Sequence, residues 1–110
     1  MCRSHTIRLC GSAAAILLAM SATALAEDAA SGKKIFTEQA KPSCTVCHTL
    51  SDAGSQGQIG PNLDDLKPSR DRVYKAVTGG VGAMPPYKDA LSDAQRRAVA
   101  DYVSQATGGG

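Results

Sequence analysis

The sequence CTVCH at residues 44–48 decides how the rest of the chain is interpreted. It has the form C-x-x-C-H, which is the attachment sequence of a c-type haem. In such a site each thiol, here Cys44 and Cys47, adds to one vinyl group of the haem. The next residue, His48, then lies under the iron and can coordinate it through a ring nitrogen. The spacing therefore predicts one covalently attached haem c with His48 as an iron ligand.

Three other uses of two nearby cysteines stay open at this point. A zinc site needs about four ligands, whereas only Cys44, Cys47 and His48 are at hand. A thioredoxin-like redox pair accompanies a strand-rich α/β domain. A plain disulfide between residues so close in sequence closes too small a loop to staple a domain. Haem attachment is favoured over all three, because it also explains the composition described next.

The first 26 of the 110 residues have the pattern of a secretory signal. Arg3 and Arg8 precede an apolar run of about 12 residues, well short of the roughly 20 that span a bilayer. The small-x-small sequence Ala24-Leu25-Ala26 then suits cleavage, with residues 22–24 as a weaker alternative. An uncleaved membrane anchor is the competing interpretation. We expect a signal peptide over 1–26, a mature domain over 27–110, and export to the periplasm.

Removal of this leader changes the charge and leaves little apolar material. The formal charge of +2 falls to zero, because the leader contains two arginines and no acidic residue. No basic cluster remains for nucleic acid. Leu, Ile, Val and Phe make up fewer than one in five of residues 27–110, a level at which a packed core becomes doubtful. A group other than side chains is therefore expected to fill the core.

The mature sequence predicts an all-α fold of three to five short helices around that group. A first helix is expected over residues 29–40, bounded by Pro42. A second follows Ser69 as N-cap and ends at Gly79-Gly80. A third begins at Ser92, with Gln95 completing a capping box. Residues 49–68 and 81–90 are expected to be loops, which are long for so small a domain and need something to wrap around.

The second axial ligand is predicted to be Met84. It provides the other soft ligand of the mature chain, and Met/His ligation raises the reduction potential of the iron. It lies in the sequence VGAMPP at residues 81–86, where the prolines stiffen the loop. A lone Met more often fills a core, but in a loop beside a haem-attachment sequence a ligand is the favoured interpretation. The iron is then six-coordinate.

With these motifs in order, the chain resembles the class I c-type cytochromes. The resemblance covers the whole mature part: an N-terminal helix, C-x-x-C-H, the sequence GPNL at residues 60–63, a Met-Pro loop and a C-terminal helix. It implies that the first and last helices cross where Gly32 and Phe36 meet Tyr102. It also implies that the carbonyl of Pro61 accepts the other ring N–H of His48.

One departure from the family is the lack of tryptophan. A haem propionate contact that Trp makes in many relatives must then come from another side chain, and the candidates are Tyr87, Tyr74 and Arg70. A narrower similarity links CHTLSDAG at residues 47–54 and GGVGAMP at residues 79–85 to the small cytochromes that accept electrons from bacterial molybdenum sulfite dehydrogenases.

These features predict a one-electron carrier and not an enzyme. Small neutral residues are expected around the exposed haem edge, namely Thr45, Val46, Ala83, Pro85 and Pro86. Lys41 and Lys88 are either steering charges or, as we prefer, ordinary solvated surface. The expected partners are a redox donor such as a sulfite dehydrogenase and a downstream cytochrome or oxidase, met as a monomer in transient complexes.

Two alternatives belong to other classes. A gas sensor or small peroxidase-like enzyme would need a displaceable sixth ligand and distal acid–base groups, and the mature chain has no second histidine for that role. A subunit held permanently by a larger dehydrogenase is the other alternative.

Overall fold

The structure is a computed structural model that describes residues 30–110. The predicted signal peptide and its cleavage site lie outside the described residues. Within the described part, no helix is long and apolar enough to cross a lipid bilayer.

The three predicted helices are all present. The first is an α-helix over residues 30–34 that continues as the π-helix η1, Ile35–Gln39. The helix α3 spans Arg70–Gly79 and α4 spans Asp93–Thr107. Both begin at the predicted caps: the Ser69 hydroxyl accepts from the Arg72 amide at 3.2 Å, and Ser92 with Gln95 forms the capping box. Local sequence therefore sets where these helices begin.

The segment expected to be loop over residues 49–68 contains regular structure instead. Two short antiparallel strands, β1 (Thr49–Leu50) and β2 (Ser55–Gln56), form a hairpin. A 3₁₀ turn, η3 (Ser51–Ala53), connects them and ends at Gly54 in the left-handed conformation, with φ 64°. The short helix α2 (Leu63–Leu66) follows, and the side chain of its N-cap Asn62 accepts from two amides. Another 3₁₀ turn, η2 (Cys44–Val46), precedes the hairpin.

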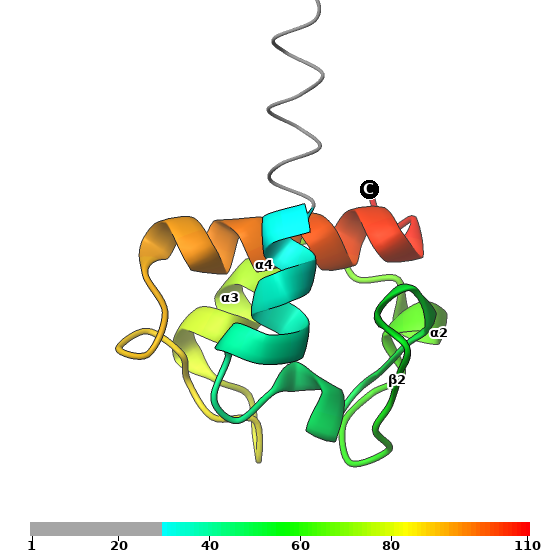
Figure 1. Cartoon of the computed structure of the whole chain (residues 1–110), viewed down its shortest axis with the longest axis horizontal. Helices are drawn as coiled ribbons and strands as arrows, with labels where there is room; N and C mark the ends of the chain where they lie inside the picture. The colour runs from blue at the N-terminus through cyan, green and yellow to red at the C-terminus, as the bar shows by residue number, and fades with distance from the viewer. Residues whose placement is uncertain (1–29) are drawn as a thin grey trace, which may run out of the picture.

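The first helix crosses α4 as the family resemblance implied (Figure 1). Gly32 makes this possible, since a Cβ there would collide with the Ala98 carbonyl oxygen and with Cβ of Tyr102. One turn later the Phe36 ring meets Tyr102 edge to face, with ring centroids 6.1 Å apart. The buried core extends from this crossing through Val99 and Val103 of α4.

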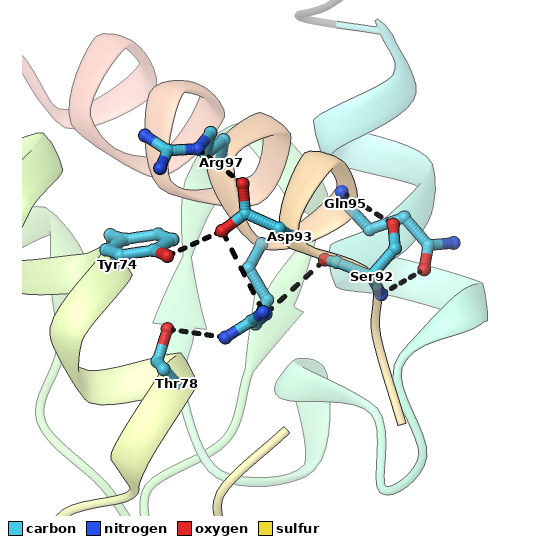
Figure 2. Close-up of polar contacts among 7 residues, drawn as sticks. Tyr74, Thr78, Ser92, Asp93, Gln95 and Arg97 are labelled. Atoms are coloured by element: carbon cyan, nitrogen blue, oxygen red, sulfur yellow. Dashed lines mark hydrogen bonds and ion pairs between the residues drawn. The ribbon is translucent and has the colours of Figure 1, made fainter. Parts of the chain in front are cut away.

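A polar network fixes α3 against α4 (Figure 2). The Tyr74 hydroxyl donates to Asp93 Oδ1 at 2.6 Å, and Arg97 Nε donates to the other carboxylate oxygen at 2.7 Å. Arg96, which is buried, donates from Nη1 to the Thr78 hydroxyl at 3.1 Å. The arrangement joins the α3 helix to the first turn of α4.

Candidate haem-binding site

A cavity of about 600 Å³ lies between the helices and the loops. Its volume is in the range of small-molecule and cofactor sites, about 300–1,000 Å³. The first helix contributes Phe36 to the wall, α4 contributes Val99 and Val103, and the rest comes from α3 and the two loop segments. Cys44, Cys47, His48 and Met84 all line this one cavity. The structure therefore brings together the thiols, imidazole and thioether predicted from distant parts of the sequence.

The His48 ring is held from its Nδ1 side. Nδ1 lies 2.8 Å from the carbonyl oxygen of Pro61, and since a carbonyl can only accept, Nδ1 carries the proton in this contact. This is the contact that the family resemblance implied. Nε2 is then the ring nitrogen left as an acceptor. Gly60 packs directly against the ring, because a Cβ there would lie 2.7 Å from Cε1 of His48.

The β1–β2 hairpin supports the main chain of the CTVCH segment. The Gly57 amide donates to the His48 carbonyl at 3.2 Å, and the Ser55 hydroxyl donates to the same oxygen. The Thr49 hydroxyl donates to the Gly57 carbonyl at 2.9 Å. Gly57 passes so close that a Cβ would lie 2.6 Å from the Thr45 carbonyl oxygen. These supporting residues were missed from the sequence, because two-residue strands have no measurable periodicity.

Met84 ends a tight turn that is closed on itself. The amide of Val81 donates to the carbonyl of Met84 at 3.1 Å, and the amide of Met84 donates back at 2.9 Å. Gly82 sits inside the turn with φ 55°, in the left-handed region. Beyond the prolines, the Tyr87 amide donates to the Val77 carbonyl of α3 at 2.7 Å. Main-chain bonds on both sides therefore fix the position from which the thioether extends.

Burial in this wall raises the pKa of two ionisable groups. The pKa of the Cys44 thiol is raised to about 11, mainly because burial disfavours the thiolate. The pKa of Tyr87 is raised to about 12, again mainly by burial, with a smaller contribution from the two nearby cysteines. The Tyr87 hydroxyl donates to the Pro42 carbonyl at 2.6 Å, which ties the Met84 loop to the attachment segment.

Two of the three side chains suggested for a propionate contact lie elsewhere. Arg70 pairs with Asp101 of α4 at 2.5 Å, and Tyr74 is bound in the network with Asp93. Neither is among the cavity-lining residues, whereas Tyr87 is. The charged side chains of α3 that do line the cavity are Arg72 and Lys75, which the sequence analysis did not single out.

The structure places only some of the residues expected around the haem edge in the cavity wall. Ala83 and Pro85 line the cavity, but Thr45, Val46 and Pro86 do not. Ile59 and Val81 do line it and remain largely solvent-exposed, at 74% and 64%. Lys41 and Lys88 are exposed and lie outside the cavity wall.

The donor set and the lining fit a haem. Two free thiols, an imidazole with Nε2 available and a thioether share one apolar cavity. These are the groups that thioether attachment and Met/His ligation require.

Comparison with known proteins assigns the family. Residues 27–103 match the family model described as cytochrome c oxidase, cbb3-type, subunit III. The chain is 35% identical over 95 residues to cytochrome c6 of Synechocystis sp., covering 79% of this chain and 72% of that protein. This chain belongs to the c-type cytochromes. Cytochrome c6 of Thermosynechococcus vestitus is 30% identical over 105 residues, covering 92% and 90% of the two chains.

A solved structure agrees with the observed fold. The crystal structure of the c-type cytochrome SorU from Sinorhizobium meliloti superposes with a TM-score of 0.72 at 49% identity, covering 74% of this chain and 93% of that one. The present cytochrome is thus a monohaem class I c-type cytochrome with the expected all-α fold. Its cofactor is covalently attached haem c, and it is an electron carrier and not an enzyme.

Proposed function

We propose that this cytochrome is a periplasmic one-electron carrier whose haem is attached through Cys44 and Cys47 and ligated by His48 and Met84. We further propose that it accepts electrons from a sulfite dehydrogenase or a similar periplasmic oxidoreductase. The convergence of these four side chains on one cavity carries the proposal. When bound, the haem supplies an iron that cycles between the ferrous and ferric states.

The protein's contribution would be to hold His48 and Met84 in place as the two iron ligands. The Pro61 carbonyl fixes the tautomer and orientation of His48, as carbonyl partners of ligating histidines do. The closed turn from Val81 to Met84 fixes, through its two main-chain bonds, the position from which the thioether extends. If both ligands stay in place in the ferrous and ferric states, the reorganisation energy of electron transfer would be small. This suits electron transfer rather than ligand exchange.

The side on which a partner would approach is the exposed apolar part of the cavity rim. Ile59 and Val81 border it, together with the small residues Ala83 and Pro85. A small apolar contact of this kind suits redox encounters, which bury little area and must separate quickly. The link to sulfite dehydrogenases comes from the resemblance of residues 47–54 and 79–85, and the similarity to SorU supports a carrier of that size and fold.

The ligation is tested by the optical spectrum of the ferric protein and of Met84→Ala. The unchanged protein should show the weak far-red band of sulfur-to-iron charge transfer, and Met84→Ala should lose it and bind carbon monoxide when reduced. Ile59→Ala is the matched control, because it also lines the cavity but offers no ligand. A high-spin spectrum, or carbon monoxide binding equally well to the unchanged protein, would favour the gas-sensor or peroxidase-like alternative instead.

The partner is tested separately with a purified sulfite dehydrogenase. Reduction of the cytochrome should require both enzyme and sulfite, and should proceed with many turnovers per enzyme if the cytochrome is a free shuttle. Co-elution as one stable complex in size-exclusion chromatography would show a fixed subunit. No reduction with sulfite present would reject this donor while leaving the ligation result unaffected.

A further inference from the structure

The cavity wall has a positive edge that the proposed ligands do not use. Arg72 and Lys75 line the cavity, and both are exposed. They are three residues apart on α3 and therefore occupy the same face of the helix. The other ionisable side chains of the wall are the two cysteines, His48 and Tyr87, so no carboxylate of the described chain lines it.

Neither cation has an anionic partner within residues 30–110. The four ion pairs of this part of the chain use Lys33, Arg70, Arg96 and Arg97 as their cations. The contrast with Arg70 is informative, because it lies only two residues from Arg72 and is paired with Asp101. The cation that points to α4 is neutralised by the protein, and the cations at the cavity are not.

The rest of the α3 wall is apolar. Val73, Ala76 and Val77 line the same cavity, and Val77 is only 4% exposed. One helix therefore presents a partly buried apolar stripe beside two exposed positive charges. This pattern matches a ligand with a flat apolar body and negative groups at one edge.

We propose that Arg72 and Lys75 bind the propionate carboxylates of the haem and take the place of the tryptophan that this chain lacks. The assignment rests on the proposed function, since it requires the haem to occupy this cavity. Arg72 can engage a carboxylate through two parallel N–H donors, whereas Lys75 acts as a compact point charge. The two cations would hold both propionates ionised and fix the orientation of the haem edge that bears them.

The test follows the protonation of the propionates through the reduction potential as a function of pH and through redox-difference infrared spectra of the carboxyl groups. An opposite charge within about 4–6 Å lowers a carboxyl pKa by 1–3 units. Arg72→Gln and Lys75→Gln should therefore each move the propionate titration upward by about one pH unit or more, and the double variant should move it further. Arg72→Lys keeps the positive charge and should therefore move the propionate titration less than Arg72→Gln does.

Lys34→Gln is the matched control, because Lys34 is an exposed cation on the first helix and lies outside the cavity wall. It should leave the titration unchanged. The far-red band is recorded first for every variant, so that loss of haem ligation is recognised as a failure of the proposed function. A normal band with an unshifted titration in the double variant would overturn the assignment. If that variant altered only the salt dependence of the reaction with a redox partner, the two cations would belong to protein docking instead.

Discussion

The helical side of this cytochrome and its loop side are stabilised in different ways. On the helical side, formed by the first helix, α3 and α4, ring packing at Phe36 and Tyr102 and the network around Asp93 join the elements directly. On the loop side, residues 42–68 and 80–87 form most of the wall of a cavity of about 600 Å³, and the helices close the rest. Amino-acid side chains complete the first side, and the second depends on its cofactor.

The largest loss of stability is expected on the loop side when haem attachment is prevented. The double variant Cys44→Ser/Cys47→Ser removes both attachment thiols. Without the haem, the apolar wall of a space of about 600 Å³ is left unfilled or in contact with water. A small domain has a total stability of only about 5–15 kcal/mol. We expect a largely unfolded chain by far-ultraviolet circular dichroism.

Thr45→Ser is the control for this experiment, because it changes the same segment and keeps both thiols. It should attach haem and melt cooperatively. A haem-free double variant with full helicity and a cooperative melt would show that the loop side folds without the cofactor.

The helical side is tested at the point where its two helices cross. Gly32→Ala introduces a Cβ against the Ala98 main chain, and overpacking of this kind costs about 1–3 kcal/mol. Gly79→Ala is matched to it, since a Cβ there meets nothing within 4 Å. We expect the urea midpoint to fall for Gly32→Ala and to stay or rise slightly for Gly79→Ala. Equal effects would mean that the crossing is not tightly packed.

Alkaline pH probes the contact that joins the two sides. Tyr102 of α4 donates to Asp52 Oδ2, in the 3₁₀ turn of the hairpin, at 2.5 Å. Burial, and then this bond, raises the pKa of Tyr102 above its usual value. Above about pH 10, where unfolded tyrosine ionises, the unfolded chain loses a proton that the folded chain keeps. Stability should therefore fall as the pH rises.

Tyr102→Phe should reduce this alkaline loss and cost about 1 kcal/mol at neutral pH through the missing hydrogen bond. Urea titrations at neutral and alkaline pH, followed by the helical signal, measure both effects. Tyr87 adds to the same loss between about pH 10, where the unfolded group ionises, and its folded-state pKa of about 12. An unchanged alkaline slope in Tyr102→Phe would assign the loss to other groups.

The smallest effect is expected at the surface of the helical side. Hydrogen bonds from Tyr74 and Arg97 lower the pKa of Asp93, so its contribution is present above the usual aspartate pKa and is lost as the pH falls through the lowered one. Asp93→Asn should slightly reduce the melting temperature at neutral pH and leave it unchanged in strong acid. Asp89→Asn, an exposed site outside the ion pairs of residues 30–110, should have no effect at either pH.

The same division explains what could be predicted from the sequence. The first residues of α3 and α4 could be predicted from Ser69 and Ser92, because an N-cap acts within one helical turn. The hairpin was missed because its strands are two residues long and are held by the turn at Gly54 and by contacts with the CTVCH segment. Such contacts are not local in sequence, and no periodic pattern marks them.

The candidate site shows a similar contrast. Cys44, Cys47, His48 and Met84 could be named from a motif and from the scarcity of suitable ligands, and the structure gathers them in one cavity. Arg70 and Tyr74 were wrong as cavity residues, because their side chains bind acidic groups of α4. In the sequence alone, Arg70 and Arg72 are equivalent charges on a surface helix. Only the position of α4 shows that Arg70 pairs with Asp101 while Arg72 lines the cavity.

The turn from Val81 to Met84 has a consequence for engineering. Its two main-chain hydrogen bonds close within four residues, and the chain returns to α3 through the bond from Tyr87 to Val77. The segment that carries the proposed sulfur ligand is thus an exchangeable unit with fixed anchor points. Variants that change residues 81–83 and keep Met84 would alter the setting of the proposed sulfur ligand while the anchor points of the segment stay the same.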